Sequence, residues 1–265
     1  MRGSILSLSL PAAWSCVAGI LAAPALASGG SVVLPVTFAG LPVGAMEYTV
    51  RVKGSDYTID GQGETGGLGR LASSASSTFR SRGRLGPDAP LPRSHSLAYR
   101  DGDKEGSASI RFRAGSIASV KETPPPTPRK DRVPVTKAML KGAIDPTSAM
   151  ILPLPADAAL AEVCGRTLKI SDARNVFTLT FTPDRSVRLK DGTRAHRCAV
   201  RYKALGGHRT SSRGVSRFER NRSLRIIYAP LATGSGNRPV WALVGFRIKT
   251  RFGIVRGTAS GVDGA

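Results

Sequence analysis

Polar and apolar side chains alternate along much of this chain, with the period of two that is typical of strands buried on one face. The pattern is clear at residues 46–53, and it resumes at residues 56–61 after a Gly54–Ser55 turn. These two stretches predict a β-hairpin. Residues 95–99 and 107–113 alternate in the same way on either side of a polar turn, and they predict a second hairpin.

The alternation recurs in the second half of the chain, which predicts further strands at residues 174–181, 195–204, 223–228 and 240–252. Helical signals are short by comparison. They occur at residues 136–141, 145–152 and 156–163, and the second begins with Asp145 as a suitable N-cap and Pro146 at the first helical position. The pattern therefore predicts a mainly β fold with a few short accessory helices.

A proline-rich run separates the predicted hairpins from the predicted helices. Residues 123–128 read TPPPTP, a composition that predicts a polyproline-like conformation. Neither flank holds the elements of a complete domain by itself. We therefore expect residues 123–134 to form a strap within one β-rich domain of residues 28–265, rather than a linker between two domains.

The amino terminus has the organisation of a secretory signal peptide. Arg2 precedes a stretch of apolar and small residues that ends at Ala25-Leu26-Ala27, the small-residue pattern that signal peptidase recognises. A retained transmembrane anchor is the alternative, and Pro11 and Pro24 argue against it. We predict that residues 1–27 are the signal peptide, that cleavage follows Ala27, and that the mature protein works in the periplasm of a Gram-negative bacterium.

The mature chain is strongly basic. Loss of Arg2 with the signal peptide leaves 38 Lys and Arg against 18 Asp and Glu, a net charge of +20. Such a charge attracts polyanions, and in the periplasm these are anionic lipids, lipopolysaccharide and acidic wall polymers. Nucleic acid is not expected, because aromatic residues make up only 6% of the chain and do not alternate with basic ones. We expect peripheral membrane contact at most.

Two cysteines, Cys164 and Cys198, remain after cleavage. An even number of cysteines in an oxidising compartment predicts one disulfide. Their spacing is too long for a CxxC redox motif, and the sequence around them lacks the set of histidines and cysteines that a zinc site needs. We therefore predict a structural disulfide.

Residues 208–225 concentrate positive charge, with six arginines against a single acidic residue, Glu219. As a loop or strand edge, this stretch predicts an anion-binding rim suited to phosphate or carboxylate groups. The alternative is a solvated rim that protects a sheet edge from aggregation. The six arginines are Arg209, Arg213, Arg217, Arg220, Arg222 and Arg225.

Two motifs resemble ligand sites but lack the required context. Residues 61–66 satisfy GxGxxG, yet they do not lie in a βαβ unit, so we interpret them as a glycine-rich bend. Residues 101–106 resemble the start of an EF-hand loop, yet Phe112 occupies the position of the bidentate glutamate. We therefore predict a hairpin turn there.

The chain holds three histidines, His95, His196 and His208, and they lie in separate segments without ligands spaced to share a metal. A histidine can still act as a base for a distant serine, but no GxSxG or SxxK motif supports a hydrolase. We predict no catalytic residue, no cofactor and no metal site.

Several local features together resemble one known family. They are the tight turn at residues 40–44, the helix start at 145–149, the cysteine segments 164–168 and 197–202, and the segments 228–230 and 250–253. Over about residues 40–257 the chain resembles the exported proteobacterial family called domain of unknown function 3108. The resemblance implies a single strongly curved antiparallel sheet, an incomplete β-barrel similar to periplasmic lipoprotein carriers, with cysteines where this chain has its pair. It implies no assigned activity.

The predicted strands carry apolar side chains at their inward positions, namely Tyr48, Val50, Val52, Ile110, Phe112, Phe177, Leu179, Phe181, Phe246 and Ile248. A sheet with such a face must bury it. We expect a non-enzymatic envelope protein that binds a lipid or another amphiphile in an apolar groove, with an anionic lipid, lipopolysaccharide or an envelope protein as partner. The alternative is a structural or interaction protein whose interior is filled by its own side chains, and a hydrolase ranks third.

Overall fold

The computed structural model describes residues 28–71, 73–234 and 236–264, so the predicted signal peptide lies outside the described residues. The front half of the sheet consists of β1 (Ser28–Phe38), β2 (Leu41–Lys53), β3 (Asp56–Thr65), β4 (Ser76–Leu85), β5 (Pro90–Asp101), β6 (Lys104–Arg113) and β7 (Ser116–Thr123). The back half consists of β8 (Ile151–Leu152), β9 (Arg166–Ser171), β10 (Val176–Arg188), β11 (Arg194–Gly206), β12 (Arg225–Leu231), β13 (Val240–Lys249), β14 (Ile254–Thr258) and β15 (Asp263–Gly264). The helices are η1 (Gly67–Leu71), α1 (Lys137–Leu140), η2 (Ser148–Met150), α2 (Leu160–Cys164) and α3 (Arg213–Arg220).

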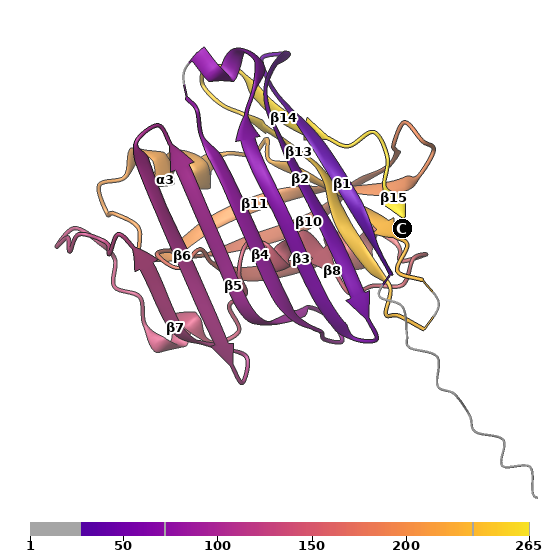
Figure 1. Cartoon of the computed structure of the whole chain (residues 1–265), viewed down its shortest axis with the longest axis horizontal. Coiled ribbons are helices and arrows are strands. Elements are labelled where there is room, and N and C mark those ends of the chain that lie inside the picture. The colour runs from indigo at the N-terminus through magenta and orange to yellow at the C-terminus, as the bar shows by residue number, and fades with distance from the viewer. Residues whose placement is uncertain (1–27, 72, 235, 265) are drawn as a thin grey trace, which may run out of the picture.

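All of these strands belong to one sheet, whose order is β7-β6-β5-β4-β3-β2-β1-β14-β13-β12-β11-β10-β9. Strands β8 and β15 pair with β13 and β1, outside this path. The strand pairs are antiparallel, and β1 joins the two halves by pairing with both β2 and β14. In Figure 1, β2 to β6 lie side by side across the front of the view, while β10 and β11 cross behind them. The predicted single curved antiparallel sheet with few helices is confirmed.

The edge strands β7 and β9 do not pair with each other within the described residues, and the segment after α1 spans the gap between them. On one side, the Gly142 N–H donates to the carbonyl of Gly115, next to β7, at 2.8 Å. On the other side, the Ile144 N–H donates to the Lys169 carbonyl of β9 at 2.9 Å, and the Ser171 N–H donates back to the Ile144 carbonyl at 2.8 Å. The segment thus pairs with backbone groups that an open edge would expose.

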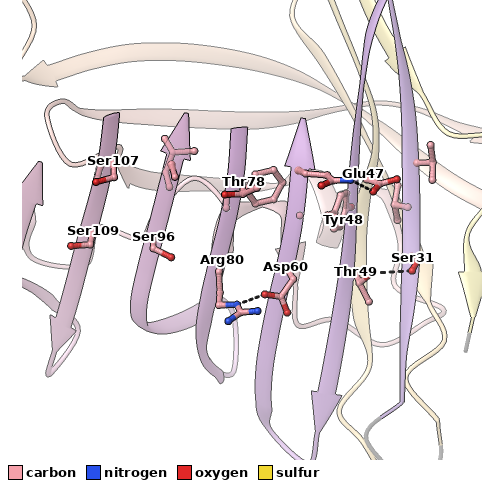
Figure 2. A pocket seen from close by; sticks show the side chains of 18 of the residues that line it. Ser31, Glu47, Tyr48, Thr49, Asp60, Thr78, Arg80, Ser96, Ser107 and Ser109 are labelled. Atoms are coloured by element: carbon pink, nitrogen blue, oxygen red, sulfur yellow. Dashed lines mark hydrogen bonds and ion pairs between the residues drawn. The ribbon is translucent and has the colours of Figure 1, made fainter. Parts of the chain in front are cut away.

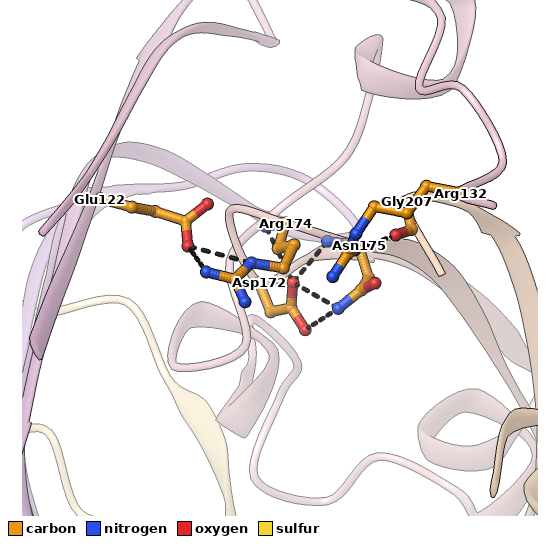
Figure 3. A network of polar contacts seen from close by, with 6 residues as sticks. All are labelled: Glu122, Arg132, Asp172, Arg174, Asn175 and Gly207. Carbon is orange, nitrogen blue, oxygen red and sulfur yellow. Dashed lines mark hydrogen bonds and ion pairs between the residues drawn. The ribbon is translucent and has the colours of Figure 1, made fainter. Parts of the chain in front are cut away.

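Polar side chains also connect these two edges (Figure 3). Arg174, in the turn between β9 and β10, forms an ion pair with Glu122 of β7 and donates to it from Nε at 3.1 Å. The Asp172 carboxylate holds the turn by accepting from the backbone N–H groups of Arg174 and Asn175 at 3.0 and 2.6 Å. The sheet is therefore open in its strand order but fastened across its gap.

The interior of the sheet is filled by residues 143–153, which we call the plug. Ten of its eleven residues are buried and Pro146 is partly buried. Ile151 packs into an apolar cluster with side chains of β1, β2, β3 and β13, whereas Leu152 packs into a second cluster around the two cysteines. The inward side chains that were predicted from the alternation are buried, as Val50 is, or partly buried, as Phe246 is.

Two predictions of local secondary structure are wrong. The helix expected at residues 145–152 is reduced to the 3-10 turn η2, because Ile151 adopts an extended conformation and pairs with Ala242 of β13. The glycine-rich bend expected at residues 61–66 lies largely within β3. Gly61 faces Phe79 of β4, and a Cβ atom at residue 61 would collide with that ring. The predicted turn at residues 101–106 is the β5–β6 hairpin.

Among the described residues, no helix combines the length and the apolar character that crossing a bilayer requires. The helices predicted at residues 136–141 and 156–163 are present in shorter form as α1 and α2. Residues 124–131 of the proline-rich segment form neither helix nor strand.

Candidate anion-binding surface

The predicted disulfide is confirmed. Cys164 ends α2 and Cys198 lies in β11, and their sulfur atoms are 2.00 Å apart. Both cysteines are fully buried in the cluster that contains Leu152 and Trp241. The bond therefore ties α2 to the back half of the sheet.

The arginine-rich stretch forms a helix, α3, rather than the loop or strand edge that we expected. The Ser212 hydroxyl caps its first turn by accepting from the Val215 N–H at 3.3 Å. Two contacts then hold the helix against β11. The Phe218 ring packs edge-on against the Tyr202 ring, with 4.9 Å between the ring centroids, and the Glu219 carboxylate accepts from the Ala204 N–H at 3.0 Å. These contacts turn the arginines of α3 toward solvent.

The six predicted arginines do not form a single rim. Arg213, Arg217 and Arg220 lie on α3, and their side chains make no hydrogen bond or ion pair within the described part of the chain. Arg209 is paired with Asp131 at 2.7 Å, and the hydrogen bond from Arg209 lowers the pKa of that carboxyl.

The remaining two predicted arginines, Arg222 and Arg225, follow the helix and lie close to Arg201. Arg222 donates to the Glu219 carbonyl at 3.0 Å, and Arg225 pairs with Asp184 at 3.2 Å. Desolvation, and then the positive charges of Arg222 and Arg225, lower the pKa of Arg201. The contribution of the two neighbouring guanidinium groups is the effect expected where like charges are held together.

Arg225 also begins a row of arginines that continues across the sheet. In the strand register, Arg225 of β12 lies directly opposite Arg247 of β13, and Arg247 lies opposite Arg256 of β14. Their chain neighbours on β12 and β13, Ile226 and Phe246, pack inward, so the row lies on the outer face. Like charges in directly opposed positions destabilise a sheet.

We call Arg201, Arg222, Arg225, Arg247 and Arg256 the arginine surface. Only Arg222 and Arg225 were singled out from the sequence. Arg201 and Arg247 occupy outward positions of predicted strands, whereas Arg256 lies in β14, beyond the last predicted strand. The neighbourhood of all three depends on which strands pair and in which register. One acidic residue, Asp184, pairs with Arg225 of this surface and with Arg197 beside it.

The outer face of the front half carries a different feature, a shallow hollow of about 870 Å³ that crosses its strands (Figure 2). Its charged lining consists of Glu47, Asp60, Arg80 and Lys121, which sum to zero. Asp60 is moreover paired with Arg80 and with Arg51 of the neighbouring strand. The hollow therefore has no electrostatic preference for an anion. The rest of its lining includes the hydroxyl side chains of Ser31, Thr49, Thr78, Ser96, Ser107, Ser109 and Thr123.

A buried polar cluster joins the plug to the front half. The Asp145 carboxylate is fully buried and accepts from the hydroxyls of Ser81 and Ser148 at 3.1 and 2.6 Å. The Ser148 hydroxyl also lies 2.7 Å from the Tyr57 hydroxyl, and His95 Nδ1 lies 3.2 Å from Asp145. Both serine hydroxyls thus donate to the carboxylate, rather than to the imidazole as a nucleophile must.

The other two histidines lie apart from this cluster. His196 is stacked on Trp241 at 4.9 Å, and its ring nitrogens lie 3.0 Å from the Ser186 hydroxyl and 3.1 Å from the Ala158 carbonyl. His208 lies in the turn before α3. Within the described residues, no group of three or more His, Cys, Asp or Glu side chains is arranged to hold a metal ion.

The fold and its outer face define an open, antiparallel β-barrel-like protein with a cationic surface on one half. The chain belongs to the family described as Protein of unknown function (DUF3108), whose model matches residues 35–260. Among solved structures, it is similar to the β-barrel-like protein of domain of unknown function DUF1849 from Brucella abortus. The two are 13% identical with a TM-score of 0.48, and the match covers 92% of this chain and 100% of that chain. No curated protein matches.

Proposed function

We propose that this protein is a non-enzymatic component of the bacterial cell envelope that binds anionic lipid headgroups, of phospholipid or lipopolysaccharide, through its arginine surface. The observation that carries the proposal is the opposed row Arg225, Arg247 and Arg256. Such a row costs folding stability. Sequences tend to break local rules of this kind at functional sites.

The headgroup chemistry follows from the residue type. A guanidinium presents a planar fork of donors that matches phosphate and carboxylate oxygens. Arg247 and Arg256 have no ion-pair partner within the described residues, and Arg201 and Arg222 donate only to backbone carbonyls there. Their charge is therefore available to an external anion.

The interior packing favours binding at the outside of the sheet over the apolar groove that we expected. The plug occupies the space that an acyl chain would need. Its Ile151 side chain is fully buried in one cluster with Val32, Val50 and Ala242, which are fully buried too. The proposal therefore keeps the predicted anionic lipid as partner and assigns the headgroup contact to the arginine surface.

The test compares two sets of three substitutions in vesicle co-sedimentation. Vesicles contain phosphatidylglycerol, lipopolysaccharide or only neutral phosphatidylcholine. We expect wild-type protein to bind both anionic kinds and to lose affinity as salt rises. Arg225→Gln/Arg247→Gln/Arg256→Gln should weaken binding at least about tenfold, since each basic residue near an anionic surface contributes about 1 kcal/mol.

The control is Arg82→Gln/Arg111→Gln/Arg113→Gln, which removes the same charge from the front half. Like Arg247 and Arg256, these three arginines make no ion pair within the described residues. We expect the affinity of the control variant for anionic vesicles to fall less than threefold (~0.6 kcal/mol). Equal loss in the two variants would show that net charge alone decides binding, and no binding to either anionic vesicle would refute the proposal.

A further inference from the structure

One end of the sheet gathers three neighbouring segments, which we call the tip. They are residues 39–42, which form the β1–β2 turn and the start of β2, residues 66–71, which include η1, and residues 250–253 between β13 and β14. Backbone contacts hold them together. The Gly66 N–H donates to the Val43 carbonyl at 3.0 Å, and the Ala39 N–H donates to the Ile254 carbonyl at 2.9 Å. In Figure 1, η1 lies at the top of the view beside the turn that joins β1 and β2.

The tip exposes large apolar side chains. Leu71 is 86% exposed and Phe252 is 70% exposed, the two highest values among the exposed large hydrophobic residues of the described chain. Leu41 is 53% exposed and Leu68 is 50% exposed. Single exposed apolar residues need no explanation, but a group on adjoining loops marks an interaction site.

The same loops carry positive charge and no acidic residue. Arg70 lies in η1, and the Arg251 guanidinium lies over the Phe252 ring at 4.1 Å. Lys249 ends β13, and its carbonyl accepts from the Asn221 side chain at 2.9 Å, which brings the end of α3 and its Arg220 to the tip. Apolar side chains flanked by cations are the composition of segments that bind in a membrane interface.

We propose that the tip is an interfacial anchor, which inserts Leu41, Leu68, Leu71 and Phe252 into an anionic lipid bilayer while Arg70 and Arg251 contact lipid phosphates. This inference rests on the proposed function, and it adds an apolar contact and an orientation to it. The acidic turn between β5 and β6 lies on the other side of η1, where Asp101 accepts from the Ser74 N–H. The molecule therefore tilts toward the membrane on the side of β13, β14 and α3.

The first experiment locates the tip relative to the bilayer. After residue 27 the chain has one tryptophan, Trp241, and it is fully buried. Phe252→Trp therefore adds a single exposed probe over a constant background. With phosphatidylglycerol vesicles that carry brominated acyl chains, we expect a blue shift and quenching for Phe252→Trp and neither for Leu91→Trp. Leu91 is 50% exposed and is the second residue of β5, close to the junction with β4 and away from the tip.

The second experiment measures the apolar contribution. Leu71→Ser/Phe252→Ser should weaken partition into phosphatidylglycerol vesicles at least about tenfold in high salt, where the contribution of exposed charges is screened. Leu91→Ser should leave partition unchanged. Both substituted sites are exposed, so thermal unfolding should match wild type and confirm that the variants are folded.

The outcomes separate the anchor from the arginine surface. Vesicle binding that is sensitive to Arg225→Gln/Arg247→Gln/Arg256→Gln, but with an unquenched Phe252→Trp or an unchanged Leu71→Ser/Phe252→Ser, would overturn the anchor and leave the proposed function standing. Quenching of Phe252→Trp without any effect of the three arginine substitutions would support the anchor and refute the arginine surface.

Discussion

The two halves of this sheet share one hydrogen-bonded ladder but differ in charge. The front half with its loops, residues 28–123, holds 12 Lys and Arg against nine Asp and Glu, a net charge of +3. Residues 124–265 hold 26 against nine, a net charge of +17. Basic character is therefore a property of one side of the molecule, and an anionic surface would meet that side first.

The halves also differ in how they are joined to the interior. The front half contacts the plug through buried hydroxyls, those of Tyr57 and Ser81, which bond to Ser148 and Asp145. The back half is fastened by the Cys164–Cys198 disulfide and by Trp241, whose indole N–H donates to the Pro155 carbonyl at 2.7 Å. The front half thus adds buried polar contacts to its apolar packing against Ile151, whereas the back half adds a covalent bond and an aromatic residue.

The largest expected effect comes from removing the covalent bond. The two cysteines are 34 residues apart, and in Cys164→Ser/Cys198→Ser no bond closes the loop between them in the unfolded chain. We expect the free energy of unfolding to fall by about 3–4 kcal/mol on the chain-entropy model. Urea denaturation followed by circular dichroism measures it, with wild type in reductant as the matched control. A loss below about 1 kcal/mol would show that the bond is not what fastens the back half.

The next effect tests the polar fastening of the front half. In wild type, the Ser148 N–H donates to the Asp145 carboxylate at 2.8 Å, and the Ser81 hydroxyl donates to it as well. Asp145→Ala leaves both of these buried donors without that acceptor. We expect a loss of about 2–3 kcal/mol, since unsatisfied buried polar groups cost about 1–3 kcal/mol each. Tyr57→Phe removes one neutral hydrogen bond and should cost about 1 kcal/mol. If both variants cost the same, Asp145 is not the centre of the cluster.

Only part of this architecture can be predicted from the sequence. Strands such as β2 and β11 were predictable because burial on one face imposes a local alternation. The arginine row was not, since it depends on the pairing of β12, β13 and β14 and on a register shift between Ile227 and Tyr228. A shift of one residue would place Arg247 on the other face.

The plug and α3 were misjudged for a related reason. Asp145 and Pro146 are a sound helix start, but pairing of Ile151 with Ala242 overrides the local preference after one turn. Helix α3 contains Gly214 and a run of arginines, so its own pattern is weak. It is held by Glu219 and Phe218 against β11, and these tertiary contacts leave no local signal.

The smallest expected effect sharpens the charge comparison through one matched pair of aspartates. Asp184 pairs with two arginines of the back half, Arg197 and Arg225, and Asp60 pairs with two of the front half. Both aspartate side chains are 24% exposed. Asp184→Asn releases two guanidinium groups, that of Arg225 on the arginine surface and that of Arg197 beside it. We expect it to strengthen binding to phosphatidylglycerol vesicles by about two- to fivefold, whereas Asp60→Asn should leave binding unchanged.

The same substitution has a defined pH dependence. The hydrogen bond from Arg197, and then the charges of Arg197 and Arg225, lower the pKa of Asp184. A carboxyl with a lowered pKa in the folded state contributes stability above its unfolded pKa of about 3.9, and that contribution disappears as the pH falls through the folded value. The free energy of unfolding of wild type should therefore exceed that of Asp184→Asn by about 1 kcal/mol or less at neutral pH. The two free energies should become equal in acid. Equal strengthening of vesicle binding by Asp60→Asn and Asp184→Asn would mean that net charge, and not the arginine surface, governs binding.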